Sequence, residues 1–223
     1  MDKLVVAVVG MRCPSCLVLR RVSVHLRFMK NISVAILGHS YVRDLKALNH
    51  STIAVTENLQ ITLSYHFRCG GTFEAFLNNS DFLDSVSLHP DIVLVYLGGN
   101  DVRIQTPLSV VYANCKRFYL TVKDRLPRAL IVASQIESRY CTSVNRFGTP
   151  AAEEYSKLAN YFDKWINRQS QFKDKLFMVK GANKLSNPEY YARDRIHLNA
   201  SGIRRLFQLL KDFLCQLCLE KFK

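Results

Sequence analysis

This amino-acid sequence lacks the features that mark non-globular and membrane-spanning proteins. It has no low-complexity or collagen-like segment, no heptad array and no internal repeat. Its first apolar run, residues 4–9, is far shorter than the roughly 20 apolar residues that span a membrane. The run is also short for a signal peptide, so we expect a strand or a frayed end there. With 223 residues, 48% of them hydrophobic, the chain is long enough for one domain with its own core.

Acidic residues are scarce relative to basic ones. The chain has 18 Asp and Glu against 31 Lys and Arg, which gives a formal net charge of +13. Such a surplus favours contact with polyanions such as nucleic acid or an acidic membrane surface. The basic residues nevertheless occur as scattered doublets, such as Arg20-Arg21 and Arg204-Arg205, and never as a run. The sequence therefore leaves two interpretations open, an ordinary basic surface and a nucleic-acid contact.

The chain has seven cysteines, a small and odd number, so they cannot all pair in disulfides. We therefore expect a reducing, intracellular compartment, with secretion left open. Two pairs, Cys13/Cys16 and Cys215/Cys218, have CxxC spacing, and a zinc site would require both pairs to meet in space. The second pair lies in an apolar helical pattern, where Cys behaves as a small hydrophobic residue. Core filling is therefore the favoured interpretation, and no metal is predicted.

Strand and helix patterns alternate along most of the chain. Residues 1–30 stand apart and are interpreted as an N-terminal extension or an extra edge strand, followed by one domain over 31–223. Alternating strands and helices favour right-handed crossovers and a mostly parallel sheet covered on both faces. The predicted fold is α/β, a three-layer α/β/α sandwich around a mostly parallel five-stranded sheet. Strands are expected at residues 32–37, 61–67, 91–97, 129–134 and 176–179, and helices at 41–48, 73–77, 108–126, 151–168 and 200–219.

Three polar segments follow the first three predicted strands: Gly38-His39-Ser40, Gly70-Gly71 and Gly98-Gly99-Asn100. Ligands of such sheets bind outside the carboxyl ends of the strands, so we expect these segments to share one edge. Ser40 offers a nucleophile at a helix start, where free backbone N–H groups favour negative charge. Alternatively, it caps that helix. Asn100 offers a hydrogen-bond donor to an oxyanion, or else belongs to an ordinary Gly-Asn-Asp turn.

A fourth segment, Asp194-Arg195-Ile196-His197, precedes the last predicted helix. His197 is able to take the proton of Ser40 while Asp194 holds the other ring nitrogen. The alternative is a surface Asp and a loop His. Asn199 and Ser201, which follow, are typical of helix caps.

Together, the four segments resemble the SGNH (GDSL-type) hydrolase superfamily. Its four sequence blocks supply a Ser, a Gly, an Asn and a His in that order. Ser40, Gly70, Asn100 and His197 match them block by block, Asp194 matches the Asp of the family's DxxH motif, and the resemblance covers the chain from about residue 31. The first block usually reads Gly-Asp-Ser, whereas this chain has Gly-His-Ser. The change removes a negative charge beside the nucleophile and adds an imidazole.

The resemblance implies the flavodoxin-like SGNH hydrolase fold and a serine esterase that cleaves a carboxylic ester or thioester. Ser40 would be the nucleophile, His197 the base and Asp194 its orienting partner. The backbone N–H groups of Ser40 and Gly70 and the side chain of Asn100 would form the oxyanion hole. Gly71 is the alternative to Gly70. No cofactor is implied, the expected partner is a small-molecule, glycan or lipid ester, and the residues expected next to the substrate are His39, Tyr41, Asp101 and Arg195.

Two other functions are compatible with the same residues. The first is a nucleic-acid-associated accessory module that keeps the hydrolase fold, since the esterase-like domain resembles accessory domains in some mobile-element proteins. The net charge of the chain suggests this function, which predicts salt-dependent binding to nucleic acid. The second is a catalytically silent relative that binds a ligand. The departure from the first sequence block at His39 suggests this function. Residues 136–150, rich in polar residues and glycine after the fourth predicted strand, are the candidate for a loop that shapes the substrate site.

Overall fold

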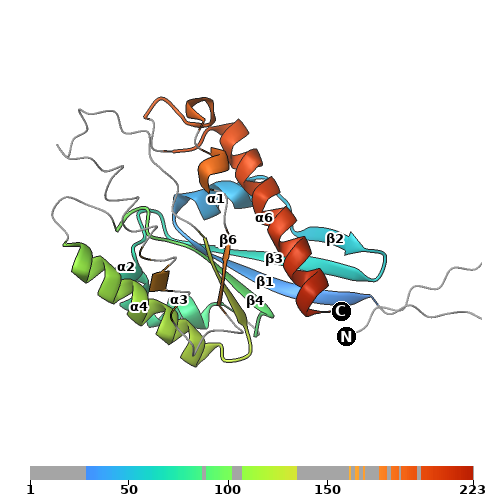
Figure 1. The fold of residues 1–223 in the computed structure, drawn as a ribbon, viewed down its shortest axis with the longest axis horizontal. Coiled ribbons are helices and arrows are strands. Elements are labelled where there is room, and N and C mark those ends of the chain that lie inside the picture. Colours follow the sequence, from blue (N-terminus) through green and yellow to red (C-terminus); the bar gives the residue numbers. More distant parts are fainter. Residues whose placement is uncertain are drawn as a thin grey trace, which may run out of the picture.

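A six-stranded sheet with helices on both faces forms the part of the chain that the computed structural model describes (Figure 1). The described residues are 29–86, 89–101, 107–134, 161, 164, 165, 168, 176–179, 182–185, 187–194 and 197–222. The strands are β1 (Lys30–Gly38), β2 (Thr52–Thr56), β3 (Leu59–Phe67), β4 (Ile92–Tyr96), β5 (Leu130–Ser134) and β6 (Leu176–Val179). The helices are α1 (Ser40–Ala47), α2 (Phe73–Leu77), α3 (Ser80–Asp84), α4 (Leu108–Arg125) and α6 (Ala200–Lys221), with short 3-10 turns η2 (Ala182–Leu185) and η3 (Pro188–Tyr190).

The strand order is β2-β3-β1-β4-β5-β6. β1 is parallel to both β3 and β4, and β5 is parallel to both β4 and β6. Without β2, the parallel strands follow the flavodoxin-like order, in which the direction of winding reverses beside the first strand. The carboxyl ends of β1 and β4 therefore flank the crevice where such sheets bind ligands, and the predicted fold class is confirmed.

The sheet has one strand more than predicted. β2 runs antiparallel to β3 and forms the outer strand of a hairpin with it. Only Ile53 of β2 is buried, while Thr52, Ala54 and Thr56 are exposed. The apolar stretch of this edge strand is only three residues long, Ile53-Ala54-Val55, and only one of them is buried, which is why the prediction of five strands missed it.

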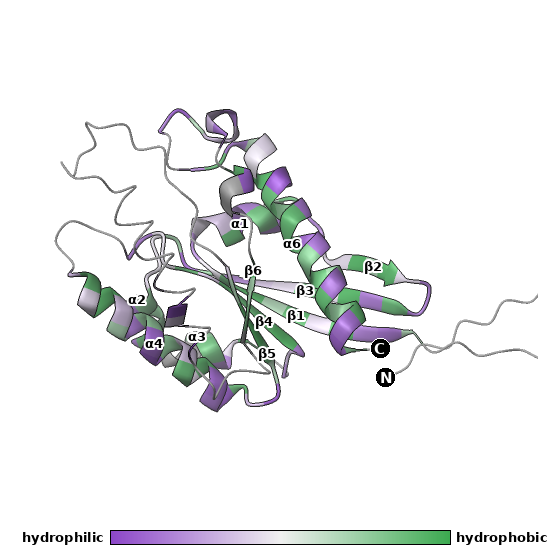
Figure 2. Ribbon diagram, viewed as in Figure 1, coloured by the Kyte–Doolittle hydropathy of each residue, from purple (hydrophilic) through white to green (hydrophobic). Residues whose placement is uncertain are grey.

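Two hydrophobic cores lie on opposite faces of the sheet. Along β1, Ala35 and Leu37 pack with α2 and α4, whereas Val34 and Ile36 pack with α1 and α6. β4 alternates in the same way, and all five of its residues are buried. Figure 2 shows β4 and β5 as hydrophobic along their length, as expected for parallel strands covered on both faces. This alternation builds the three layers.

Several predictions fall on residues outside the described ranges. These are the extension or edge strand over residues 1–28, the Cys13/Cys16 pair, the loop at 136–150 and most of the helix at 151–168. Within that last segment, Tyr161, Lys164, Trp165 and Arg168 are described and helical. β1 begins at Lys30, so the proposed domain boundary near residue 30 remains a prediction.

The last helix begins on a side-chain cap and a close backbone contact. The Asn199 side chain accepts the N–H groups of Ser201 and Gly202, each at 3.0 Å, so the predicted cap at Asn199 is confirmed. Gly202 is buried, and a Cβ atom there would overlap the carbonyl oxygen of Tyr190 and press on Leu198. α6 therefore packs on the η3 segment through a residue that has no side chain.

We expect Gly202→Ala to lower the free energy of unfolding by about 1–3 kcal/mol, because the added methyl group forces backbone to move. Urea unfolding followed by circular dichroism measures the effect. Arg205→Ala, an exposed position of the same helix, is the control and should stay within about 0.5 kcal/mol of the wild type. An unfolding midpoint of Gly202→Ala equal to that of the wild type would contradict the close packing.

None of the helices in the described ranges has both the length and the apolar character needed to cross a membrane.

Candidate active site

The end of β1 sets the position of Ser40. Gly38 pairs with Phe67 of β3 and Tyr96 of β4, and a Cβ atom at Gly38 would overlap the Tyr96 carbonyl oxygen. The absence of a side chain thus lets β1 end between its neighbours and turn directly into α1. The N-cap of α1 is His39, so Ser40 is the first helical residue and lies at the positive end of the helix. The alternative that Ser40 caps the helix is wrong.

His39 is buried in an aromatic cluster under this turn. The residue is only 3% exposed, and its Nδ1 lies 3.5 Å from the backbone nitrogen of Tyr41. The ring centroids of His39 and Tyr41 are 5.0 Å apart, and those of His39 and Tyr96 are 5.7 Å apart. The imidazole of His39 therefore serves as a helix cap and packs against two tyrosine rings.

The glycine pair after β3 meets the side chain of Asn100. The Nδ2 of Asn100 donates a hydrogen bond to the carbonyl oxygen of Gly71 at 3.2 Å. The N–H of Gly71 donates to the carbonyl oxygen of Arg68 at 2.9 Å, while Gly70 has a left-handed backbone with a φ of +69°. Because the Gly71 N–H is engaged in the turn, the geometry favours Gly70 as the donor that the sequence left open between the two.

Asn100 also sits in the turn that the sequence indicated as its alternative. The N–H of Asp101 donates to the carbonyl oxygen of Gly98 at 3.1 Å, and Gly98 has a φ of +107°. Asp101 itself is 6% exposed, and its Oδ1 accepts the N–H of Phe73, the first residue of α2, at 2.9 Å. Asp101 was predicted to lie next to the substrate, and the structure places it where it ties the loop after β4 to α2.

Asp194 and His197 form a hydrogen-bonded pair. Nδ1 of His197 lies 2.7 Å from Oδ2 of Asp194, and the backbone N–H of His197 donates to Oδ1 of the same carboxylate at 3.0 Å. Both side chains are about half exposed, at 49% and 48%. Two bonds to one carboxylate fix the imidazole and leave its Nε2 edge pointing away from Asp194.

The loop that carries this pair is closed by backbone and side-chain bonds. Tyr191 and Leu198 form an antiparallel bridge, and the Ala192 N–H donates to the His197 carbonyl oxygen at 2.8 Å. Asn199 donates from Nδ2 to the carbonyl oxygens of Glu189 at 2.6 Å and Tyr191 at 3.1 Å. The sequence indicated Asn199 only as a helix cap. Its second role, holding the loop of His197, depends on distant carbonyl groups that no local motif reveals.

Contacts between the four segments bring them to one edge of the sheet. The ring of His197 packs edge-on against Tyr41, the residue after Ser40, with centroids 6.3 Å apart and planes at 85°. The Arg68 N–H donates to the Gly38 carbonyl oxygen at 3.0 Å, which joins the segment of Gly70 to the segment of Ser40. With the bond between Asn100 and Gly71, these contacts link all four segments, as the sequence predicted from the strand ends. Arg195, the remaining candidate, lies outside the described residues.

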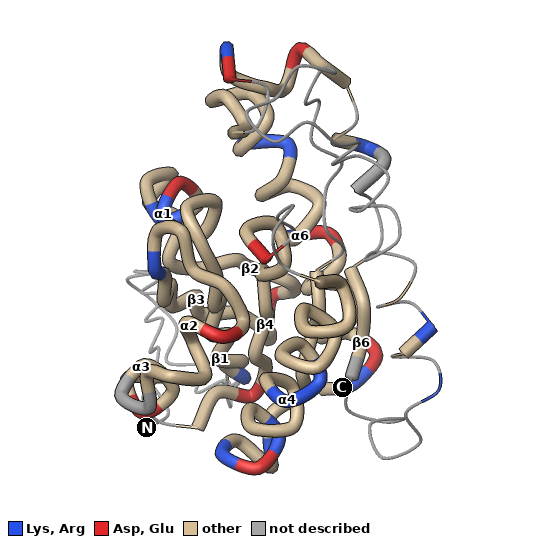
Figure 3. The backbone as a smooth tube through the Cα atoms, turned by 90° about the vertical axis from the view of Figure 1, so that its left-hand side faces the viewer, with Lys and Arg blue, Asp and Glu red and all other residues tan. Residues whose placement is uncertain are grey.

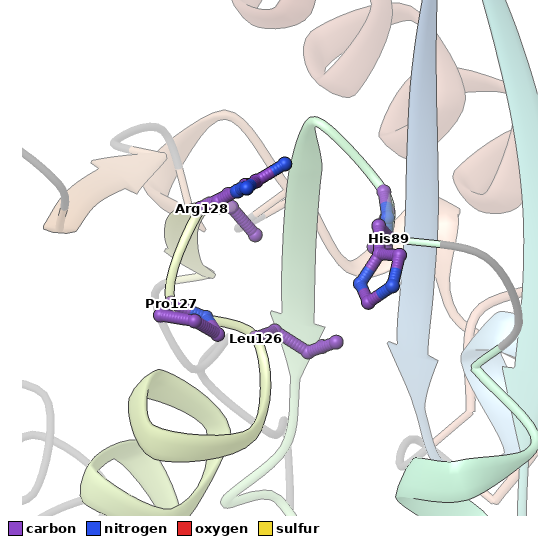
Figure 4. A pocket seen from close by; sticks show the side chains of 6 residues that line it. His89, Leu126, Pro127 and Arg128 are labelled. Carbon is purple, nitrogen blue, oxygen red and sulfur yellow. The ribbon is translucent and has the colours of Figure 1, made fainter.

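A separate hollow of about 230 Å³ lies elsewhere (Figure 4), lined by His89, Pro90, Leu126, Pro127, Arg128 and Ala129. Those residues precede β4 and β5, so the hollow opens at the amino ends of the strands, opposite Ser40. It takes no part in the arrangement of the four segments.

Metal-ligating residues do not gather in the described part of the chain, where no group of three or more His, Cys, Asp or Glu could hold an ion. Cys218 is fully buried and Cys215 packs beside it, so the predicted core filling by this pair is confirmed. Near the site, burial and, secondarily, Lys46 lower the pKa of His66, on β3, below its usual value.

Comparison with known families finds one match that spans most of the chain. The model of the GDSL-like lipase/acylhydrolase family matches residues 37–205, a range that includes all four segments. Comparison with curated proteins finds no match to this sequence.

Similar solved structures include the psychrotrophic esterase EstA from Pseudoalteromonas sp., inhibited by monoethylphosphonate, at 18% identity and a TM-score of 0.56, over 82% of this chain and 98% of that one. They also include a carbohydrate esterase family 3 protein from Talaromyces cellulolyticus, at 15% identity and a TM-score of 0.60, over 85% and 99%. A third is the lipase/acylhydrolase from Enterococcus faecalis, at 16% identity and a TM-score of 0.56, over 83% and 96%. At these identities the likeness shows a shared fold.

Proposed function

The chain belongs to the GDSL-like lipase/acylhydrolase family, and on that premise we propose that it hydrolyses carboxylic esters through Ser40, His197 and Asp194. The observation that carries the proposal is the bonded pair of Asp194 and His197, packed through Tyr41 against the start of α1. An imidazole with a carboxylate on Nδ1 and a serine at the adjacent helix start is the arrangement that acyl transfer requires.

In the proposed reaction, Ser40 Oγ attacks the carbonyl carbon of the ester while Nε2 of His197 accepts its proton. Asp194 keeps the other proton on Nδ1 and stabilises the imidazolium ion that forms. The tetrahedral intermediate collapses, His197 returns the proton to the leaving alcohol, and an acyl group remains on Ser40. A water molecule, activated by the same imidazole, then releases the acid and restores the hydroxyl group.

The negative oxygen of the tetrahedral intermediate would accept hydrogen bonds from the backbone N–H groups of Ser40 and Gly70 and from Asn100. The first lies at the positive end of α1, which favours developing negative charge. A side-chain amide nitrogen carries two N–H donors. One bond to the Gly71 carbonyl oxygen and one to the oxyanion are therefore compatible, and the first of them orients Asn100 for the second.

Asn100→Ala is expected to lower kcat by about 10²–10³-fold, the typical effect of removing one oxyanion donor. The matched control is Asn58→Ala, in the turn between β2 and β3 at the other end of the sheet, which should retain wild-type kcat. Thermal unfolding of both variants separates a loss of catalysis from a loss of folding. A folded Asn100→Ala protein with an unchanged kcat would remove Asn100 from the proposed oxyanion hole.

The direct test of the proposal is covalent labelling by an organophosphonate ester probe, which reacts preferentially with an activated serine. Mass spectrometry should find the adduct on the peptide that contains Ser40, and a panel of short acyl esters, acetylated sugars and thioesters should identify the substrate class. Labelling should disappear in His197→Ala, because the hydroxyl group loses its base. An unlabelled, folded wild-type protein, beside a labelled control esterase, would contradict the proposal.

A further inference from the structure

Arg43 lies beside the proposed nucleophile without a role in the reaction above. It is three residues after Ser40 on α1, so the two side chains share a helix face, and helical side chains lean toward the N-terminus. Its Nη1 lies 3.7 Å from the Sγ atom of Cys69, the residue that precedes Gly70. The guanidinium group therefore reaches from the helix of the nucleophile to the loop that carries the proposed oxyanion donor.

Asp44 holds this guanidinium group in one direction. Its Oδ1 accepts from Nε at 2.8 Å and contacts Nη2 at 2.7 Å, and the Asp44 side chain is more buried than that of Arg43, at 25% against 51% exposure. The hydrogen bond to Asp44 also raises the pKa of Arg43 above its ordinary value. An exposed ion pair of this kind contributes little to stability, so its main effect is to orient a permanent positive charge.

Other basic side chains lie close to the same segments. Arg68 precedes the glycine pair, and its Nη1 donates to the Ala75 carbonyl oxygen of α2 at 3.2 Å. Arg193, exposed, precedes Asp194. The acidic groups near them include Asp44, which is paired with Arg43, Asp194, which is paired with His197, Glu74 in the first turn of α2, and the buried Asp101. Figure 3 shows the basic and acidic positions of α1 next to each other.

We propose that Arg43 makes the site selective for esters that carry an anionic group, a carboxylate, within a few bonds of the scissile carbonyl. The inference rests on the proposed esterase function and names its substrate class. A guanidinium group has five N–H donors in a planar fork that fits a carboxylate. Since Asp44 takes the Nε side, an incoming carboxylate can be bound from the side of Nη1, which faces Cys69 and the Gly70 loop.

The test compares two activated esters of similar length, neutral p-nitrophenyl butyrate and the anionic p-nitrophenyl hemisuccinate. The measured quantity is the ratio of their kcat/KM values, anionic over neutral. Arg43→Gln should lower this ratio by about 10- to 100-fold, the effect of removing a hydrogen-bonded charge partner, and Arg43→Glu should lower it further. Arg128→Gln, which removes the same charge at the opposite edge of the sheet, should leave the ratio at the wild-type value. Raising the salt concentration should reduce the wild-type preference.

The outcomes separate this inference from the function on which it rests. If the wild type cleaves the neutral ester and the ratio is the same in Arg43→Gln, the selectivity of Arg43 is refuted while the esterase stands. Equal loss of both activities in a folded Arg43→Gln protein likewise refutes selectivity and assigns Arg43 a structural role. If the wild type cleaves neither ester and the phosphonate probe leaves Ser40 unlabelled, the esterase function fails and the inference fails with it.

Discussion

Replacing Ser40 with alanine is expected to lower kcat/KM for a short acyl ester by about 10⁴-fold or more, because no acyl-enzyme can form without the hydroxyl group. The substitution is small and suits the first turn of a helix, so the fold should be retained. Hydrolysis of p-nitrophenyl acetate, with the phosphonate-labelling assay beside it, measures the loss.

The control for this variant is Ser51→Ala, an exposed serine before β2 that lies outside the four segments. It should keep wild-type kcat/KM and wild-type labelling. Activity that survives in Ser40→Ala would have to come from another nucleophile or from a contaminant, and would exclude Ser40 as the catalytic nucleophile of the proposal.

The second large effect is expected for Asp194→Asn, with a loss of about 10⁴-fold in kcat. Asp194 uses both oxygens, one for the His197 backbone N–H and one for Nδ1 of the ring. An asparagine keeps only one acceptor. With its oxygen on the backbone N–H, its NH₂ group faces Nδ1 and forces the ring proton onto Nε2, so His197 can no longer accept the proton of Ser40.

The alternative amide orientation is no better, because the NH₂ group would then oppose the backbone N–H and loosen the loop. Asp212→Asn, on the exposed face of α6, is the matched control and should retain full activity. Thermal unfolding of each variant shows whether the loop change spreads to the fold. An Asp194→Asn enzyme that keeps a third of the wild-type kcat would contradict the orienting role of Asp194.

The sequence predicted those strands and helices whose buried residues form a continuous apolar run or a clear periodic pattern. β4 is an unbroken apolar run because both of its faces are covered, and glycines mark the point where it ends. The sequence did not predict β2, because three of its five residues are exposed to solvent. The prediction did not separate α3 from the helix that begins at Phe73, because only Asn78 and Asn79 lie between α2 and α3.

The candidate site was predictable to the extent that its residues follow strand ends or lie a fixed few residues apart. The contact of Asp194 with His197 follows from a three-residue spacing, and the meeting of Asn100 with the glycine pair follows from parallel strands, β3 and β4, that flank β1 and end at the same edge of the sheet. His39 as the N-cap of α1 did not follow, because serine is the better capping residue by local preference. Which carbonyl groups Asn199 reaches is decided by the packing of η3 on α6, and no local pattern carries that information.

The bond from Asn100 to Gly71 joins the loop after β4 to the loop after β3. Two of the proposed oxyanion donors thus belong to a single preorganised unit, and little reorganisation is left for the moment when charge develops. Substitutions at Gly70 and Asn100 should accordingly be non-additive, since displacing either loop misaligns the donor on the other.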